Sequence, residues 1–373
     1  MKILYIATVI EHITSFHLPY LKWFKEQKWE VHVAANIKTA KNKNIKYCDK
    51  THDIAICRSP FKFDNIKAYF QLKNILKEEK FDIINSHTPM GGILARLCGK
   101  IHRKSGTKIL YTAHGFHFYK GAPFINWLLY YPVEKLLSKY TDALITLNHE
   151  DYALARSKMQ AENIYYIPGI GIDINKFSKP DIVREIKRKE LNIPSDAAVI
   201  ISIGELSKRK NHLAAIKALG KIKSEKIYYI ICGEGRLKES LIKLCKDSGV
   251  GNRVMFLGYR TDTADLLHMS DIFLFPSKQE GLPVALMEAM AAGLPCVVSE
   301  IRGNVDLISD SKGGYLCGVN DVESYANAVV QLVKSQNLRF GMGEYNKAVI
   351  KDFDISVVME RMFKIYGETG KFE

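Results

Sequence analysis

The stretch that decides the fold is Asp271-Ile-Phe-Leu-Phe-Pro-Ser-Lys-Gln-Glu280-Gly-Leu-Pro-Val-Ala-Leu-Met-Glu288. Its apolar run after Asp271 predicts a buried strand, the Gly-Leu-Pro sequence predicts a tight turn, and the residues after Pro283 predict a helix. The first backbone N–H groups of a helix have no intrahelical partner and point outward, so a helix that follows a strand in this way offers an anion site. The stretch therefore predicts a strand–turn–helix unit into which a diphosphate fits.

Two carboxylates accompany this turn: Glu280 precedes it, and Glu288 follows about two helical turns later. A carboxylate at Glu288 can accept hydrogen bonds from a vicinal diol such as a ribose, and each charge-assisted bond contributes roughly 1.5–3 kcal/mol. The alternative is structural, with Glu280 stabilising the helix dipole and Glu288 on a solvated face. The two carboxylates together with the Gly-Pro turn favour the binding interpretation.

Length and composition indicate an ordinary globular protein of two domains. The chain has 373 residues, of which 47% are hydrophobic and 25% charged, and this balance excludes a disordered chain. No uncharged apolar run approaches the roughly 18 residues needed to span a bilayer, and the first ten residues predict a strand rather than a signal peptide. The seven Cys contain no Cys-x-x-Cys pair, so neither a disulfide framework nor a zinc site is indicated, and a reducing cytoplasm is expected.

Short β-branched runs alternate with helical patterns, which predicts parallel βαβ units and an α/β fold of two doubly wound domains. Ligands of such sheets bind at the carboxyl ends of the strands. Glycine and proline between Ile167 and Asp173 mark the boundary. We expect an N-terminal domain over 1–167, a C-terminal domain over 168–353, and a helix over about 354–373. The expected strands are Lys2–Ala7, Glu30–Ala35, Ile83–Ser86, Ile109–Ala113, Ala143–Leu147, Ala198–Ile203, Ile227–Cys232, Arg253–Leu257, Ile272–Phe275 and Cys296–Ser299.

The net charge of +14 is concentrated in the first half of the chain. Residues 1–165 contain 25 Lys and Arg against 14 Asp and Glu, a balance of +11. No zinc finger, RNP-type motif or recognition helix is present, so nucleic acid is not the expected partner. An anionic membrane surface is, since each nearby basic residue contributes roughly 1 kcal/mol. The segments 20–29 and 124–139 mix aromatic residues with Lys as interfacial helices do, unless their Trp residues belong to the core.

Several separated motifs carry a family resemblance. In the second half, the stretch from Glu280 to Glu288 resembles the nucleotide-sugar half of the retaining glycosyltransferases of family 4, together with Gly204-Glu-Leu-Ser-Lys-Arg-Lys-Asn211, Cys232-Gly-Glu-Gly235 and Phe256-Leu-Gly-Tyr259. The first half is similar to the exopolysaccharide and capsule subgroup. The motifs of that likeness are Phe16-His-Leu-Pro-Tyr-Leu-Lys-Trp-Phe24, His87-Thr-Pro-Met-Gly-Gly92, Thr112-Ala-His-Gly-Phe-His-Phe-Tyr-Lys-Gly121 and Arg302-Gly-Asn-Val-Asp-Leu-Ile308.

The resemblance implies the GT-B fold, in which two Rossmann-like domains face a central cleft, with the C-terminal helix packed back on the N-terminal domain. It implies a hexosyl- or N-acetylhexosaminyl-type glycosyltransferase that moves a sugar from a nucleotide sugar, UDP-linked in our expectation, with retention of configuration. The expected acceptor is a polyprenyl-diphosphate-linked glycan in exopolysaccharide or capsule biosynthesis. We therefore expect a cytoplasmic enzyme, peripheral at the inner face of the cell membrane.

The resemblance also implies roles for individual residues. His114 and Glu280 would be the catalytic residues beside the donor sugar, while Lys210, Arg209 and the backbone of Gly281 and Leu282 would bind the diphosphate. Glu288 would bind the ribose, and Gly258, Tyr259 and Arg260 would lie where the base is read. No metal and no cofactor is expected, because Lys210 and the helix N-terminus can neutralise the leaving diphosphate.

Two features keep alternatives open. Many members of the family place an Arg directly after the glycine of the strand-end turn, where this chain has Glu205. Arg209, beside Lys210, could supply the missing charge, although a side chain next in sequence usually points in another direction, so both possibilities stay open. The loop Thr8–Thr14 lacks the Gly-Gly turn that many members have. A nucleotide-sugar epimerase on the same fold, or a catalytically inactive scaffold for polysaccharide assembly, therefore remains an alternative. His12, His87 and His117 are weaker candidates for the site.

Overall fold

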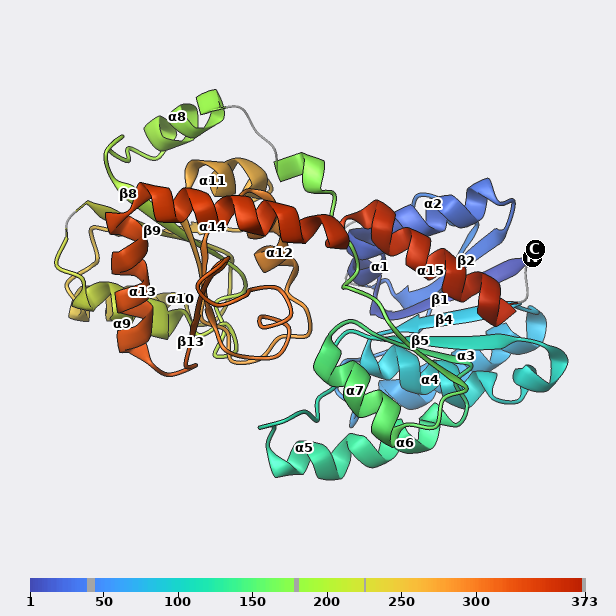
Figure 1. The fold of residues 1–373 in the computed structure, drawn as a ribbon. Helices are drawn as coiled ribbons and strands as arrows, with labels where there is room; N and C mark the ends of the chain where they lie inside the picture. Colours follow the sequence, from blue (N-terminus) through green and yellow to red (C-terminus); the bar gives the residue numbers. More distant parts are fainter. Residues whose placement is uncertain (39–43, 178–180, 225, 371–373) are drawn as a thin grey trace. The chain divides into compact units, whose positions relative to one another are not determined.

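The chain forms two compact units in a computed structural model that describes residues 1–38, 44–177, 181–224 and 226–370. The first unit comprises Met1–Ile170 and the chain from Val358 onward, and the second comprises Gly171–Val357. Each unit is a parallel β-sheet with helices on both faces (Figure 1). Within the expected domains and the expected last helix, residues 39–43, 178–180, 225 and 371–373 lie outside the described residues.

The first unit contains a seven-stranded parallel sheet with the strand order β3-β2-β1-β4-β5-β6-β7. The strand order reverses between β1 and β4, which pair in register from Ile3 with Ile83 to Ile6 with Ser86. The strands are β1 (Lys2–Val9), β2 (Glu30–Asn36), β3 (Lys50–Asp53), β4 (Ile83–His87), β5 (Lys108–Ala113), β6 (Ala143–Thr146) and β7 (Asn163–Tyr166). The helices are α1 (Ile10–Phe16), α2 (Leu18–Glu26), α3 (Asp64–Glu78), α4 (Pro89–Gly99), α5 (Phe124–Leu129), α6 (Tyr131–Ser138) and α7 (His149–Lys158).

The second unit contains a six-stranded parallel sheet with the order β10-β9-β8-β11-β12-β13, which reverses between β8 and β11. Its strands are β8 (Ala198–Ile203), β9 (Ile227–Cys232), β10 (Val254–Gly258), β11 (Ile272–Phe275), β12 (Cys296–Ser299) and β13 (Gly314–Cys317). Its helices are α8 (Asp181–Glu190), α9 (His212–Lys221), α10 (Lys238–Asp247), α11 (Thr263–Met269), α12 (Val284–Ala291), α13 (Val322–Lys334), α14 (Gln336–Val349) and the start of α15 (Ile355–Gly370).

The core of the second unit lies on both faces of its sheet. Along β8, Val199 and Ile201 belong to one buried cluster with β11 and α12, whereas Ile200 belongs to another with α9 and α13. This alternation follows from the period of two along a strand, and it explains why a strand covered on both faces is a continuous apolar run. The Asp271 carboxylate anchors the amino end of β11, because it accepts hydrogen bonds from the Arg188 guanidinium at 2.7 Å and the Val199 N–H at 2.7 Å.

The last helix, α15, supplies part of the core of the first unit. The Tyr366 hydroxyl lies 2.9 Å from the Tyr5 hydroxyl and accepts a 2.6 Å hydrogen bond from the Asn85 amide, so it bridges β1 and β4. The Phe363 ring stacks on Trp23 at a centroid distance of 3.9 Å. The aromatic face of α2 is therefore covered by α15.

All ten expected strands are present, with ends that differ by at most two residues. The expectation was incomplete at three edges, where β3, β7 and β13 were not foreseen. Strand β3 has the sequence Lys-Thr-His-Asp, and β7 is no more than half-buried, because an edge or outer strand lacks the continuous apolar signal of a central one.

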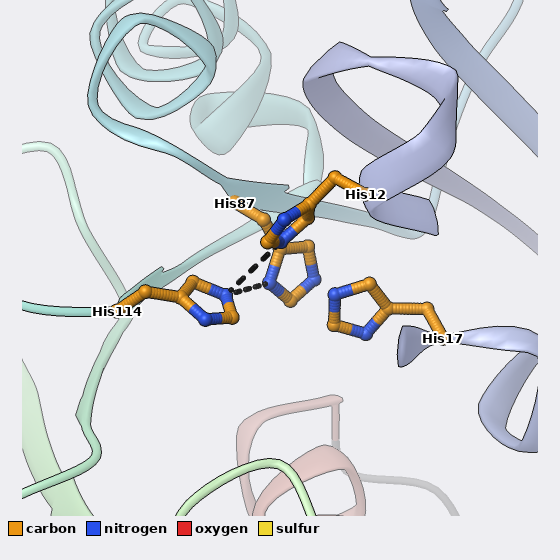
Figure 2. Close-up of side chains that lie close together, drawn as sticks. All are labelled: His12, His17, His87 and His114. Carbon is orange, nitrogen blue, oxygen red and sulfur yellow. Dashed lines mark hydrogen bonds between the residues drawn. The ribbon is translucent and has the colours of Figure 1, made fainter. Parts of the chain in front are cut away.

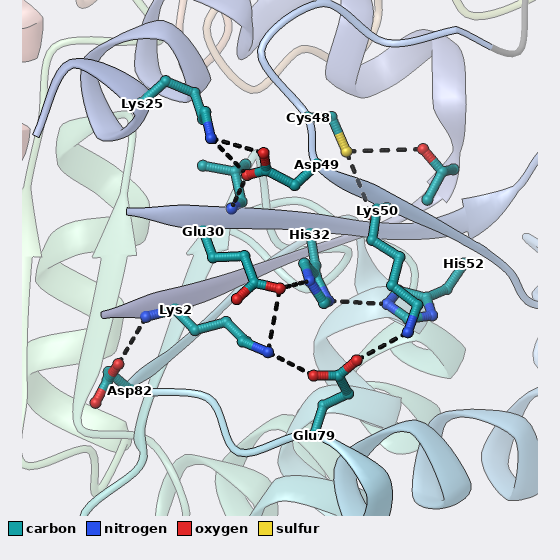
Figure 3. A network of polar contacts seen from close by, with 12 residues as sticks. Lys2, Lys25, Glu30, His32, Cys48, Asp49, Lys50, His52, Glu79 and Asp82 are labelled. Carbon is teal, nitrogen blue, oxygen red and sulfur yellow. Dashed lines mark hydrogen bonds and ion pairs between the residues drawn. The ribbon is translucent and has the colours of Figure 1, made fainter. Parts of the chain in front are cut away.

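A polar network holds together the amino ends of β1, β2 and β3 (Figure 3). The Glu79 carboxylate pairs with Lys2 and with Lys50, the latter at 2.8 Å. The buried His32 ring lies 2.8 Å from a Glu30 oxygen and 3.0 Å from Nε2 of His52. These groups join the edge strand β3 to the sheet at the end opposite to the carboxyl ends of the strands.

A buried ion pair links α4 to α6 in the first unit. The Arg96 side chain is fully buried, and its guanidinium donates to Gly92 O and to Glu134, each at 2.8 Å, while it lies 4.2 Å from the centre of the Tyr111 ring. Gly92 is required there, because a Cβ at this position would come within 2.4 Å of the same Tyr111 ring.

Replacing Glu134 by Ala leaves the Arg96 charge buried without its partner, and removing one partner of a buried pair costs about 3–5 kcal/mol. Because Trp23, Trp29 and Trp127 all belong to the first unit, tryptophan fluorescence during urea unfolding measures that unit. We expect Glu134→Ala to lower the urea midpoint markedly. The matched control is Glu360→Ala, which removes an exposed pair with Lys364 and is expected to leave the midpoint nearly unchanged. Equal midpoints for both variants would contradict this account.

Candidate active site

The carboxyl ends of β8 and β11 bring Lys210, Arg209 and Glu280 together in the second unit. The Glu280 Oε1 atom accepts hydrogen bonds from Lys210 Nζ at 2.8 Å and from Arg209 Nη1 at 2.9 Å. This is the point at which the strand order of the sheet reverses, where ligands of doubly wound sheets bind. The sequence left open whether Arg209 reaches the position of Lys210, and in the structure both cations converge on one carboxylate.

Arg209 and Lys210 lie in the turn that precedes Asn211. Asn211 has a left-handed conformation with φ of 56°, which Asn tolerates better than most residues, and it is the N-cap residue of α9. Its side-chain amide is buried and donates to Pro276 O at 3.0 Å and Val319 O at 3.1 Å, so the loop after β8 is fastened beside the end of β11. The two consecutive side chains therefore reach Glu280 from a turn that is held in place at this end of the sheet.

The Lys210 side chain is closely packed by its neighbours. Its Nζ atom is 4.4 Å from the centre of the Phe275 ring, and a Cβ on Gly204 would come within 3.0 Å of its side chain. Burial lowers the pKa of Lys210, while the Glu280 charge opposes that shift. Glu280 therefore supports the positive charge of Lys210 inside the protein.

The predicted anion site at the start of α12 has the expected local structure. Gly281 and Leu282 lie in the turn after β11, and the N-cap residue Pro283 provides no side-chain hydrogen bond to the first turn of the helix. Gly303 closes on this turn, since a Cβ there would come within 2.2 Å of Gly281 O. The Arg302 guanidinium donates to Glu280 O at 3.2 Å and was not foreseen as part of the site.

Glu288 lies on α12 and is not on a solvated face. Its burial raises the pKa of the carboxyl group to about 7, and the charge of Lys176 counteracts this shift. A carboxylate that is poorly solvated and half-protonated near neutral pH gains more from a diol that donates hydrogen bonds than a solvated one does. The environment of Glu288 thus suits the predicted ribose contact.

The three residues expected to lie near the base differ in how accessible they are to a ligand. Gly258 has a positive φ of 68° and Tyr259 is 76% exposed, so both are accessible to a ligand. The Arg260 guanidinium is instead engaged with Asp262, through hydrogen bonds of 2.7 and 2.6 Å. Asp262 in turn pairs with Lys187 at 2.8 Å and makes no side-chain capping bond to α11.

In the first unit, His114 belongs to a cluster of four histidines at the carboxyl ends of the strands (Figure 2). His114 Nε2 lies 3.3 Å from Nε2 of His12, which is on α1, and 3.2 Å from Nδ1 of His87, the last residue of β4. The fourth ring, His17, lies between α1 and α2, with its centroid 3.9 Å from that of His87. Sequence reasoning missed His17 and gave His12 and His87 little weight. His117 lies outside this cluster and stacks on Tyr130.

The loop between β4 and α4 is strained beside these rings. Thr88 has a φ of 65°, which is rare for a β-branched residue. Its hydroxyl lies 2.8 Å from the Thr8 hydroxyl and accepts a 3.1 Å hydrogen bond from the Thr8 N–H, so β1 holds the loop in place.

A cavity of about 630 Å³ opens beside His12. Its lining is mainly apolar and includes Phe16, Phe61, Met90, Phe116, Phe118 and Val133, with Arg58 as a basic group. The apolar side chains around it continue onto an exposed surface, which we call the α5–α6 apolar surface: Phe124, Ile125, Leu128, Leu129, Val133 and Leu136, each between 39% and 80% exposed. In the part of the chain that the structure describes, no helix has the length and apolar character to cross a bilayer.

Comparisons with known proteins agree on the family. Residues 183–349 match the model described as glycosyl transferases group 1, and residues 2–148 match the one described as glycosyl transferase 4-like. The putative glycosyltransferase EpsD of Bacillus subtilis is 38% identical over 98% of this chain and 96% of its own length. An Escherichia coli UDP-Gal:alpha-D-GlcNAc-diphosphoundecaprenol alpha-1,3-galactosyltransferase is 30% identical over 83% of this chain and 81% of its own.

Solved structures share the fold. The Anabaena protein HepE in complex with UDP superposes with a TM-score of 0.82 at 18% identity, over 99% of this chain and all of that one. The glycosyltransferase WaaG of lipopolysaccharide biosynthesis gives 0.77 at 18% identity, over 97% and 99% of the two chains. With a family model matched in each half and a relative 38% identical along nearly its whole length, the chain belongs to the glycosyltransferases of family 4, on the GT-B fold.

Proposed function

We propose that this glycosyltransferase moves a hexosyl or N-acetylhexosaminyl group from a UDP-sugar to a polyprenyl-diphosphate-linked glycan, with retention of configuration, in exopolysaccharide or capsule biosynthesis. The observation that carries the proposal is the pairing of Lys210 and Arg209 with Glu280, next to the helix that holds Glu288. Two relatives support the acceptor, because both are named for transfer to sugars on a diphospho-undecaprenol carrier. HepE, whose fold is shared, was crystallised with UDP.

On the donor side, the diphosphate would compete with Glu280 for the two cations. Phosphate oxygens match both a Lys point charge and the fork of an Arg, so Lys210 and Arg209 would turn to the diphosphate. The Glu280 carboxylate would then be free to accept hydrogen bonds from the donor sugar. Negative charge that develops on the leaving diphosphate would meet cations already in place, which is the largest contribution such a site makes.

The remaining donor contacts are proposed from the same geometry. The turn at Gly281 and Leu282 would present backbone N–H groups to the phosphates, and Glu288 would bind the ribose diol. Gly258 and Tyr259 would contact the base, whereas Arg260 would act through Asp262 rather than on the ligand, since its guanidinium is already paired. His114 would stabilise the donor sugar as an oxocarbenium-like species forms. No metal is required at the diphosphate in this scheme, because the two cations supply its charge.

On the acceptor side, the cavity beside His12 and the α5–α6 apolar surface fit a lipid better than a free sugar. Two exposed lysines accompany that surface, Lys135 on α6 and Lys139 directly after this helix. Apolar side chains together with cations match an interface with anionic lipids. The segment 20–29 does not serve this purpose, because Trp23, Phe24 and Trp29 pack against the core and α15. We therefore place the enzyme at the cytoplasmic face of the membrane through α5 and α6.

The donor site is tested by calorimetry of UDP binding in EDTA. We expect wild type to bind UDP without metal and Glu288→Ala to lose about 2–3 kcal/mol, roughly 30- to 150-fold in affinity, because the ribose loses its charged acceptor. The matched control is Glu323→Ala, which removes an exposed carboxylate of the same unit that pairs with Lys221. GDP serves as the comparison for the base.

Equal UDP binding by wild type and Glu288→Ala would overturn the ribose assignment. With the nucleotide established, labelled UDP-sugars and a polyprenyl-diphosphate glycan in EDTA should give labelled lipid, with the anomeric configuration of the donor retained in NMR spectra of the product. Interconversion of UDP-sugars without acceptor would favour the epimerase, and UDP binding without turnover on any lipid glycan would favour the scaffold.

UDP affinity should rise with pH across neutrality. The carboxyl group of Glu288 has a pKa raised to about 7, and the diol donates to its ionised form, so binding is strong above that pKa and weakens as pH falls through it. If only the ionised form binds the ribose, the affinity at about pH 8 exceeds that at about pH 6 by roughly tenfold. Glu288→Gln should lack this tenfold rise in affinity. Because the protonation of UDP itself affects both proteins alike, the ratio of wild-type to variant affinity at each pH isolates the contribution of Glu288. The same slope in both proteins would contradict the assignment.

The membrane assignment predicts that the protein sediments with vesicles that contain anionic phospholipid at low salt. The double variant Phe124→Glu and Leu128→Glu places two negative charges on the α5–α6 apolar surface. It should lose most of this binding, because each carboxylate would have to enter the lipid interface for the surface to bind. Phe340→Glu, at an exposed phenylalanine of the second unit, is the control and should sediment like wild type. Unchanged sedimentation of the double variant would exclude this surface as the contact.

A further inference from the structure

The four histidines of the first unit follow or end three different strands, but their rings lie close together. His12 and His17 follow β1, His87 ends β4, and His114 follows β5. Figure 2 shows their rings gathered at this point, with dashed lines from His114 to His12 and to His87. The polypeptide thus gathers imidazoles at the reversal of the strand order, in a position that sequence spacing does not reveal.

The spacing of their nitrogen atoms is close to that of a tetrahedral metal site. One nitrogen from each ring lies within 4.8 Å of those of the other three, and two of the separations are 3.2 and 3.3 Å. Zinc–nitrogen bonds of about 2.0–2.1 Å in a tetrahedron put ligand nitrogens about 3.3 Å apart. Two pairs already have this spacing, and small side-chain rotations would bring in the others.

The protonation state of the rings suits a cation. Burial lowers the pKa of His12 to about 4, and the pKa values of His17, His87 and His114 are also shifted well below their usual range by burial. Neutral imidazole offers a lone pair, which metal binding requires. Among the residues that the structure describes, His17 Nε2 is buried without a hydrogen-bond partner, and so is His87 Nε2, which is the other ring nitrogen from the Nδ1 atom that lies near His114. A buried nitrogen without a partner needs an explanation, and for His17 a bound ion supplies one.

The donor set selects the class of ion. Within the described residues the cluster contains imidazole ligands only, and imidazole suits Zn²⁺, Co²⁺, Ni²⁺ and Cu²⁺, whereas Mg²⁺ and Ca²⁺ prefer oxygen ligands. Neutral ligands leave the ion with its charge of +2. Arg58, which faces His12, adds a further positive charge, so a bound ion also needs an anion or hydroxide. The cavity of about 630 Å³ that His12 borders gives such a ligand access.

We propose that His12, His17, His87 and His114 form a binding site for one first-row transition-metal ion, with Zn²⁺ the best match. This site lies on the first unit and is distinct from the diphosphate site of Lys210, so transfer at the diphosphate stays metal-independent. A bound ion would occupy His114 Nε2, and this consequence rests on the proposed function, in which His114 acts on the donor sugar. The ion would consequently act as an inhibitor of transfer that chelators relieve.

The test uses the full-length protein without a histidine tag, freed of metal by EDTA and then titrated with Co²⁺. We expect one equivalent to bind with the intense visible absorption of tetrahedral Co²⁺, and Zn²⁺ to displace it. His17→Ala and His87→Ala should each weaken binding by about tenfold or more, because each removes one ligand. His52→Ala is the matched control. It removes a histidine on β3 that contacts another histidine, His32, outside the proposed site.

A second measurement guards against misfolded variants. Zn²⁺ should raise the thermal unfolding midpoint of wild type and of His52→Ala, because it binds only the folded state, but should not raise that of His17→Ala. His12→Ala, at a half-buried position, repeats the test if His17→Ala fails to fold. The proposal is overturned if wild type gives no tetrahedral Co²⁺ spectrum, if His17→Ala and His12→Ala bind Co²⁺ as wild type does, or if only His52→Ala loses the ion. Retained UDP binding in EDTA by these variants separates this result from any failure of the donor site.

Discussion

The reversal of strand order beside the central strand is the constraint on which both candidate sites depend. In each unit the chain leaves the first strand toward one edge of the sheet and later returns to add a strand on the other side. The loops that leave these two strands diverge, so an open place remains above their carboxyl ends. The second unit fills that place with Lys210 and Glu280, and the first unit fills it with His12 and His87.

The same topology carries two opposite kinds of electrostatics. In the second unit a buried Lys210 keeps its charge because Glu280 is 2.8 Å away, and the group is ready to exchange that partner for an anion. Among the described residues of the first unit, the four histidines have no carboxylate partner of this kind, and burial, together with the neighbouring histidines, lowers the pKa values of His87 and His114 in favour of the neutral rings. The second unit therefore presents a charged group suited to an anion. The first unit presents neutral imidazoles, which offer lone pairs.

Much of this structure could be predicted from sequence, and the reasons for the exceptions are physical. Central strands such as β8 and β11 are covered on both faces and so appear as apolar runs, whereas β3 is a polar edge strand. The spacing of Glu280 and Glu288 could be read directly, because one turn and one helix connect them. The convergence of Arg209 and Lys210 could not, since neighbouring side chains are expected to diverge and the folded turn at 208–210 brings both to Glu280. His17 was missed because its neighbours come from distant strands, and no local period records their meeting.

The route of α15 has a consequence for how the protein is made. The first unit holds the opening 170 residues of the chain, yet Tyr5, Trp23 and Asn85 obtain their partners from Phe363 and Tyr366. During synthesis these groups emerge from the ribosome long before the helix that covers them. Until α15 is synthesised, the aromatic face of α2 stays uncovered. The second unit is continuous in sequence, so it can complete its own core before the first unit does. The first unit can therefore complete its core only after α15 has been synthesised, and α15 follows the second unit in the sequence.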